Sequence, residues 1–407
     1  MSSVKEHFEI PGRYKQWSLG LSGVGVLSLI IGYIMYGGTD HGTRFWASLL
    51  QNSVYFLLIT NAAMFFFCAT TLAYGGWTLT FRRVSEAVSV SVIPIGIITF
   101  VILMALVFGG KTTIYEWLDP ELVKHDAVLN GKKGFLNPTF FTVWTTLSIG
   151  LWILIGKKMR SISQEIDNHP LTTVEEGKKY IFKNTVWSAI YIVWFALTVA
   201  SVTPWVWLMS INAHWFSTMY SWYTFASSFV AGIALITLFV IYLKNQGYLE
   251  YTNQEHLHDL GKFQFAFSIF WTYLWFAQFM LIWYANISEE TIYFKSRFDG
   301  AYKGIFYLNL VINFLAPLLI YMKASSKRNY ATVTFMSVLL IFGHWLDFFQ
   351  MVFPYHYPNE VPLNLFDFGV ALGFVGLIMW QTGQVLSKVP LLAKNHPFLK
   401  ESIIHHT

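Results

Sequence analysis

Residues 87–108 read AVSVSVIPIGIITFVILMALVF and contain no charged side chain. An α-helix rises about 1.5 Å per residue, so a stretch of this length can cross the ~30 Å hydrocarbon core of a bilayer. Similar stretches recur along the whole chain of 407 residues, of which 55% are hydrophobic and only 12% are charged. Soluble domains carry roughly a quarter charged residues. The composition therefore predicts a membrane protein with one integral domain over residues 1–407.

The apolar stretches and the residues that interrupt them predict ten membrane-spanning helices. Their expected ranges are 17–36, 45–68, 87–108, 138–155, 184–208, 219–242, 263–284, 304–321, 331–353 and 365–386. They are too long and too uniformly apolar for the ~10-residue alternating strands of a membrane β-barrel. The first span lacks the small-residue cleavage pattern of a signal peptide, so we expect it to be retained. The predicted fold class is an all-α polytopic membrane protein.

The distribution of Lys and Arg predicts the orientation of these helices. With ten spans, the two termini and every second connection share one side, and that side holds most of the 27 Lys and Arg residues. Cytoplasmic loops retain positive charge, so both termini are expected in the cytoplasm. The basic residues lie in short loops rather than in one patch, so the net charge of +5 does not indicate a nucleic-acid partner.

A weak internal similarity divides the spans into two groups of four. Two apolar spans each begin with a charged segment. These segments are RRVSEAVSVS at 82–91 and HDLGKFQFAFS at 258–268. This pattern predicts a first four-helix bundle over 45–208 and a second over 219–353, flanked by the helices at 17–36 and 365–386. An even number of spans per unit would make the repeat parallel. Chance similarity among apolar helices explains the same pattern about as well.

The segment FGHWLDFFQMVFP at 342–354 places polar side chains inside a predicted span. His344, Asp347 and Gln350 recur every three residues and so lie close to one helical face. A carboxylate inside the membrane costs ~2.5 to 3.5 kcal/mol on insertion scales, which favours a functional role such as a proton relay or ion binding. The alternative is that His344 and Asp347 form hydrogen bonds with each other or with a neighbouring helix.

Glu86 is a second intramembrane candidate, because it follows Arg82 and Arg83 at the start of a span. The two arginines and the helix dipole both favour a carboxylate there. A purely structural, interfacial cluster is the simpler interpretation. Gln278 is expected to form hydrogen bonds between helices, like three asparagines and two further glutamines within spans: Asn61, Asn309, Asn313, Gln381 and Gln384.

The sequence gives little support for a redox centre or a metal site in this chain. Only His344 among the 12 histidines lies clearly inside a span, and Cys68 is the single cysteine, so neither paired haem ligands nor a disulfide framework is expected. His256, His258 and Asp259 could bind a metal, but we expect a solvated loop there. There is also no nucleotide-binding P-loop, serine-hydrolase elbow or zinc-protease motif.

Three segments resemble a known family: HWFSTMYSWYTFASSFVAGIAL at 214–235, DLGKFQFAFSIFWTYLWFAQFMLIWYANISEET at 259–291 and GHWLDFFQMVFP at 343–354. They are similar to the membrane subunits of bacterial alternative complex III, a quinol oxidoreductase that passes electrons to a cytochrome c or a similar acceptor. The resemblance covers most of the chain, and the second segment is its most specific part. It is strongest to the smaller of two homologous ten-span subunits, the F subunit, which is related to polysulfide-reductase-type (NrfD-like) anchors.

The resemblance implies a location in the bacterial inner membrane and two four-helix bundles. It implies that iron–sulfur clusters and c-type haems belong to partner subunits, that a homologous membrane subunit accompanies this chain, and that a terminal oxidase is a further candidate partner. This chain would bind no redox cofactor and would contact lipid. Its implied roles are support and a proton path, to which we assign His344, Asp347 and Glu86, with Arg82, Arg83, Gln278 and Gln350 as supporting polar residues.

Two other functions remain open from the sequence. The chain could itself bind quinol, beside Glu86 or His344. It could instead be an independent secondary transporter, which requires helices broken in the middle of the membrane. Pro94, Pro204 and Pro317 are the candidates for such breaks, although proline is common in membrane helices.

Overall fold

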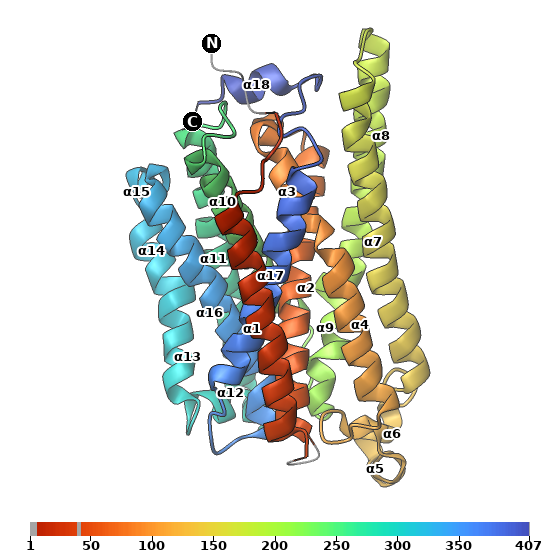
Figure 1. The fold of residues 1–407 in the computed structure, drawn as a ribbon. Helices are drawn as coiled ribbons and strands as arrows, with labels where there is room; N and C mark the ends of the chain where they lie inside the picture. Colours follow the sequence, from red (N-terminus) through yellow and green to blue (C-terminus); the bar gives the residue numbers. More distant parts are fainter. Residues whose placement is uncertain (1–5, 39–41, 407) are drawn as a thin grey trace.

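The computed structural model describes residues 6–38 and 42–406, which fold into a long bundle of helices (Figure 1). Ten helical segments are long and apolar enough to cross a membrane, and no strand occurs in the described residues. The segments are Gly12–Tyr36, Thr43–Leu72, Arg82–Phe108, Pro138–Asn168, Val174–Asn212, Met219–Asn245, Gln254–Ala285, Lys303–Tyr321, Tyr330–His356 and Leu365–Leu386. The predicted all-α polytopic membrane fold is confirmed.

Several helices extend beyond their predicted apolar ranges. The fourth span, α7 (Pro138–Asn168), continues thirteen residues past its predicted end, and α8 (Val174–Leu197) begins ten residues before its predicted start. Thr173 caps α8 through a reciprocal pair of hydrogen bonds with Glu176. These extensions carry charged side chains, because a helix can continue into water after it leaves the lipid. Hydropathy therefore located the lipid-crossing part and missed the polar ends.

Two helices form the centre of the molecule: α2 (Thr43–Leu72) and α10 (Met219–Asn245). They are the most buried of the ten spans, with 78% and 83% of their most apolar windows buried. The first helix group consists of α2 with α3 (Arg82–Val90), α4 (Val92–Phe108), α7, α8 and α9 (Thr203–Trp207). The second helix group consists of α10 with α11 (Gln254–Ala285), α13 (Lys303–Leu310), α14 (Ala316–Tyr321) and α16 (Tyr330–His356). The groups meet where α2 packs against α10.

The first and last spans, α1 (Gly12–Tyr36) and α17 (Leu365–Leu386), pack against each other along one side of the bundle (Figure 1). Their backbones approach closely at Gly25 and Gly373, where a Cβ added to Gly25 would lie 2.3 Å from the Gly373 Cα. Small residues permit this close approach, which is the usual way in which membrane helices gain packing contacts.

The two terminal segments lie at the same end of the molecule (Figure 1). The Phe8 N–H donates to the Leu386 carbonyl at 3.2 Å, and the Leu391 N–H donates to the Glu6 carbonyl at 2.8 Å. The short helix α18 (Leu399–Ile403) covers this end by packing on the 3₁₀ turn η2 (Gly76–Thr80). The opposite end carries α5 (Pro120–His125), α6 (Ala127–Lys132) and α12 (Ser288–Phe298).

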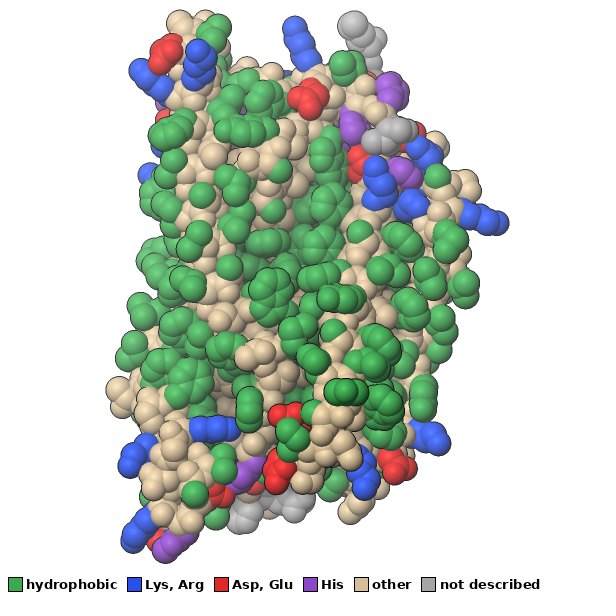
Figure 2. Space-filling model, turned by 180° about the vertical axis from the view of Figure 1, so that it is seen from behind, with side chains coloured by type: hydrophobic (Ala, Val, Ile, Leu, Met, Phe, Trp, Pro, Cys, Tyr) green, Lys and Arg blue, Asp and Glu red, His purple; other side chains and the backbone are tan. Residues whose placement is uncertain are grey.

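The surface has the pattern expected of a protein that crosses a bilayer. Figure 2 shows hydrophobic side chains over the middle of one face and most of its charged side chains near the two ends. The exposed apolar residues include Leu154, Val193, Leu281 and Leu319 on four different spans. In water such a surface would aggregate, whereas in lipid it is the ordinary outer face of a membrane protein.

Two spans contain a π-helical turn that ends two residues before a proline. Thr198–Val202 precedes Pro204, and Val311–Leu315 precedes Pro317. Proline lacks an N–H and clashes with the preceding turn, so the helix widens locally and continues. Pro94 lies within the first turn of α4, where its missing N–H costs little. These prolines reshape the helices without unwinding them.

Candidate functional site

Asp347 on α16 is the most deeply placed carboxylate of the second helix group, with 1% of its surface exposed. Its two oxygens accept hydrogen bonds from the Tyr223 hydroxyl, from the Ser227 hydroxyl at 2.8 Å, from the Trp271 indole at 3.0 Å and from the Asn309 amide at 3.0 Å. These donors come from α10, α11 and α13. All four are neutral, and within the described part of the chain no Lys, Arg or His lies close enough to form an ion pair with Asp347.

A single hydroxyl joins Asp347 to His344, its neighbour one turn earlier on α16. Ser227 Oγ lies 2.9 Å from His344 Nδ1 and 2.8 Å from an Asp347 oxygen. The other ring nitrogen, Nε2, is buried and has no hydrogen-bond partner among residues 6–38 and 42–406. The predicted pair is thus brought together, but through Ser227 rather than directly. A serine hydroxyl both donates and accepts, so it can pass a proton between the two groups.

Asp347 also faces a hollow at the side of the second helix group. Gln278 on α11 and Gln350 on α16 line the same hollow, so two of the predicted supporting residues do gather around Asp347. The Gln278 amide nitrogen has no hydrogen-bond partner among the described residues. A buried polar atom without a protein partner is the usual place for a bound water.

Arg297 on α12 lines this hollow and was not predicted from the sequence, where it reads as a loop residue. Only 6% of its surface is exposed. Its guanidinium donates to the carbonyl oxygens of Gln350 at 3.0 Å and Tyr293 at 2.6 Å, and lies 3.5 Å from the centre of the Tyr293 ring. In the described part of the chain no carboxylate pairs with Arg297, so the hollow contains an uncompensated positive charge.

A second and larger hollow adjoins the first and shares Tyr293 and Arg297 with it. It is lined by residues from the connection after α9, from α12 and from the end of α16, among them Trp215, Met351 and Tyr355. The two hollows together lead from the α12 end of the molecule to Asp347. Arg297 and Tyr293 stand between them.

On the other side of His344, polar residues continue toward the end that carries the termini. Gln264 on α11 donates to Thr237 and Ser337, each at 3.0 Å, and accepts from the Tyr321 hydroxyl at 2.8 Å. Ser268 lies one turn further along α11, about 6 Å by helix rise. Its hydroxyl is buried and has no partner among the described residues. The helical spacing of Gln264, Ser268 and Gln278 on α11 was the sequence signal that could have found this row.

The π-helical turn between α13 and α14 adds Asn313 to this row. Its amide donates to the Asn309 side chain at 2.6 Å, and Asn309 in turn donates to Asp347. The Asn313 side-chain oxygen is buried without a partner in the described residues. We call the set that runs from Gln264 through Ser268, Asn313 and His344 to Asp347 the polar row.

Glu86 lies in a different environment, within the first helix group. Its carboxylate accepts from Arg82 at 3.3 Å, from Arg83 at 2.8 Å and from the Ser163 hydroxyl at 2.5 Å. Arg83 also donates to Asp167 at 2.6 Å. The structure therefore brings Arg82, Arg83 and Glu86 together as predicted, but in an ion-paired cluster that shares no hydrogen bond with Asp347.

Other polar residues serve helix packing. Asn61 on α2 accepts a hydrogen bond from Tyr191 on α8, as expected of an interhelical partner. The expectation of a solvated loop at His256, His258 and Asp259 is wrong, because these residues are buried in the first turns of α11. The C-terminal segment covers them, and His405 lies 2.7 Å from Asp259. Among the described residues, no group of three or more His, Cys, Asp or Glu is arranged to hold a metal ion.

Comparison of the chain with protein-family models gives no match. Comparison with curated proteins gives no match either.

Proposed function

We propose that this chain is the F-type membrane subunit of a quinol:electron-acceptor oxidoreductase of the alternative complex III type, in which it supports the assembly and conducts protons. The observation that carries this proposal is the polar row that ends at Asp347, a buried carboxylate with neutral hydrogen-bond donors only. Such a carboxylate can gain and lose a proton without breaking an ion pair. Intramembrane carboxylates of this kind mark proton paths in many pumps.

The surroundings of Asp347 support a path with two parts. From the α12 end, the two adjoining hollows bring space for water up to Asp347. Toward the opposite end, the polar row continues through His344, Asn313 and Ser268 to Gln264. Buried polar atoms without protein partners along this row provide the sites at which waters would complete a proton relay. Arg297 at the junction of the hollows would oppose the passage of other cations.

The proposal places the electron carriers outside this chain. Iron–sulfur clusters and c-type haems belong to partner subunits, a homologous membrane subunit lies beside this one, and a terminal oxidase is a further candidate partner. The chain resides in the bacterial cytoplasmic membrane with both termini in the cytoplasm. The excess of Lys and Arg at the terminal side supports this orientation. The pairing of the two terminal segments at one end supports only their location on the same side of the membrane.

Purification of the assembly through a tag on this chain tests whether the chain belongs to such a complex. We expect iron, c-type haem absorption and a second ten-span subunit to copurify. A preparation without partners and without haem would refute the assignment to a respiratory complex.

Replacement Asp347→Asn in the whole complex tests the proton path. The complex, reconstituted in liposomes and driven by quinol oxidation, should keep its subunits and its electron transfer but lose most of its transmembrane proton movement. Asp299→Asn is the matched control, because Asp299 is an exposed carboxylate just beyond α12. Unchanged proton movement in the Asp347→Asn complex would refute a path through Asp347.

Quinol binding within this chain is the second candidate function. The larger hollow favours it, because aromatic side chains and Arg297 line a space that adjoins the hollow faced by Asp347. A quinone found there in the purified chain would support this function. A quinone found only in the homologous subunit would exclude it.

A further inference from the structure

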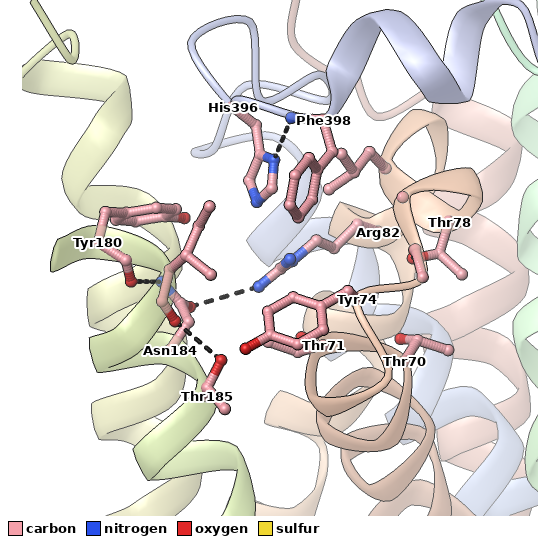
Figure 3. A pocket seen from close by; sticks show the side chains of 14 residues that line it. Thr70, Thr71, Tyr74, Thr78, Arg82, Tyr180, Asn184, Thr185, His396 and Phe398 are labelled. Carbon is pink, nitrogen blue, oxygen red and sulfur yellow. Dashed lines mark hydrogen bonds between the residues drawn. The ribbon is translucent and has the colours of Figure 1, made fainter. Parts of the chain in front are cut away.

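A third hollow lies at the end of the molecule that carries the termini (Figure 3). It is formed by the end of α2, the 3₁₀ turn η2, the first turns of α8 and the loop that follows α17. Residues of these four segments and of the first turn of α3 line it, among them Tyr74, Arg82, Asn184 and His396. The proton path proposed above does not use this hollow.

Arg82 supplies the positive charge of the hollow. Its guanidinium is buried, with 6% of the residue exposed, and reaches across the hollow toward Asn184 on α8 (Figure 3). The hydrogen bond to the Asn184 oxygen is long, at 3.5 Å. Its carboxylate partner, Glu86, lies closer to Arg83, at 2.8 Å against 3.3 Å for Arg82. Arg82 is therefore only partly neutralised by the groups around it.

The whole cluster behind the hollow carries a surplus of positive charge. Arg82, Arg83 and Arg160 face two carboxylates, Glu86 and Asp167. Asp167 pairs with Arg83, and the hydrogen bond of Arg160 goes to the neutral Ser89 hydroxyl at 3.0 Å. A buried charge without full compensation is costly unless something neutralises it. The cluster thus favours an anion in the adjoining hollow.

His396 provides a second donor at the same place. Its Nδ1 accepts the Phe398 N–H at 3.2 Å, so a neutral ring carries its proton on Nε2. Burial, together with Arg82 and Arg83, lowers the pKa of His396 to about 3, and the ring is therefore neutral at pH 7. Figure 3 shows its free nitrogen directed into the hollow. Neutral His396 can donate to an anion without adding further charge to the cluster.

Tyr74 closes the front of the hollow from a strained position. It follows the end of α2 with a φ of 53°, in the left-handed region where glycine is the usual residue. A tyrosine held there costs of order 1 kcal/mol, and such strain concentrates at ligand sites. More than half of the Tyr74 side chain is exposed, and its ring lies beside Arg82 in Figure 3.

The hollow opens beside a lipid-facing surface. Thr185 and Ile181 on α8 line it, and the next residues on the outer face of the same helix are apolar and exposed: Phe182, Val186 and Ile190. These three recur every four residues and so form one stripe along α8. An acyl chain could lie on this stripe while its headgroup occupies the hollow.

We propose that this hollow binds the phosphate ester of an anionic phospholipid, held by the Arg82 guanidinium and the His396 Nε2–H, with an acyl chain along Phe182, Val186 and Ile190. Basic pockets between membrane helices recognise anionic headgroups in this way. The phosphate supplies the missing negative charge of the arginine cluster, and the headgroup ties α2, α8 and the C-terminal loop together. This site stands independently of proton conduction.

Lipid binding to the full purified chain in detergent tests the proposal. Native mass spectrometry with phosphatidylglycerol and with phosphatidylcholine should show a preference of about tenfold for the anionic lipid, the effect of one charge-assisted contact. Arg82→Gln should abolish this preference. Arg13→Gln is the matched control, because Arg13 is an exposed basic residue at the same end, and it should leave the preference intact.

The variant His396→Leu keeps the test decisive if Arg82→Gln does not fold, because His396 lies outside the ion pairs of the cluster. It should weaken phosphatidylglycerol binding severalfold. Equal affinity for the two lipids, or an unchanged preference in His396→Leu, would overturn the proposal. Thermal protection by inorganic phosphate that matches the protection by phosphatidylglycerol would also overturn it, because it would assign the site to a soluble anion.

Discussion

Glu86 and Asp347 are two buried carboxylates in opposite helix groups, with 2% and 1% of their surfaces exposed. They resemble each other in burial and differ in their partners. Glu86 is paired with Arg82 and Arg83, whereas Asp347 accepts hydrogen bonds from neutral donors only. Within the described residues Asp347 forms no ion pair of this kind, although Arg297 lines the same hollow.

This difference separates a structural carboxylate from one that can carry protons. Protonation of Glu86 would leave two buried arginines poorly compensated, which is strongly unfavourable. Protonation of Asp347 breaks no ion pair, because Arg297, which lines the same hollow, is not paired with it. A buried carboxylate therefore stabilises the helix packing in the first helix group. In our proposal, a buried carboxylate transfers protons in the second.

The largest expected effect is on stability and belongs to Glu86. Replacement Glu86→Gln removes the charge that pairs with Arg82 and Arg83, and it should lower the free energy of unfolding by about 3–5 kcal/mol. Chemical denaturation in detergent micelles measures this. Glu165→Gln is the matched control, because the exposed Glu165–Lys183 pair joins α7 and α8 at the surface and should contribute little. Equal stability of both variants would remove the structural role given to Glu86.

Replacement Asp347→Asn should cost less, about 1–2 kcal/mol, because it breaks no ion pair and disturbs only one or two of the four hydrogen bonds. The same denaturation experiment measures it beside Glu86→Gln. A loss as large as that of Glu86→Gln would mean that the Asp347 charge balances a cation, and the contrast between the two carboxylates would fail.

Ser268→Ala sharpens the comparison by separating stability from conduction. The Ser268 hydroxyl is buried without a partner in the described part of the chain, so its loss should change stability by less than about 1 kcal/mol. Proton movement in liposomes should nevertheless slow, because a water site of the polar row disappears. In the control Ser228→Ala, the lost hydroxyl bonds only within α10, to the Phe225 carbonyl. Equal rates in both variants would place the path elsewhere.

The smallest expected effect concerns Asp126, which lies 2.7 Å from His214 at the α12 end of the molecule. This distance is close to the 2.8 Å between Glu86 and Arg83, but the Asp126–His214 pair is far more exposed to solvent. The His214 hydrogen bond and the α6 backbone N–H groups lower the pKa of Asp126. Its contribution to stability is therefore present above the unfolded pKa of about 3.9 and is lost as the pH falls through the lower folded value.

Thermal unfolding of Asp126→Asn measured across this pH range tests that expectation. The variant should differ slightly from the unmodified chain at pH 7 and converge with it in strong acid. A difference as large as that of Glu86→Gln would show that burial is not the cause of the contrast between the ion pairs.

The sequence alone determined the fold class, the ten spans and the residues that share a helical face. Hydropathy and the helical repeat depend only on residues near one another in the chain, so they predicted that His344, Asp347 and Gln350 lie together on one span. They likewise placed Arg82, Arg83 and Glu86 at one helix start.

Contacts between helices were decided only by the tertiary structure. Three features each join segments that are far apart in the chain: the Ser227 bridge, the uncompensated Arg297, and the hollow between Arg82 and His396. Each contact depends on how a helix is rotated and how far it is displaced along its axis. Packing of all ten helices together sets those two quantities, because most apolar faces can pack against several partners. That packing therefore decides which buried charges form ion pairs and which do not.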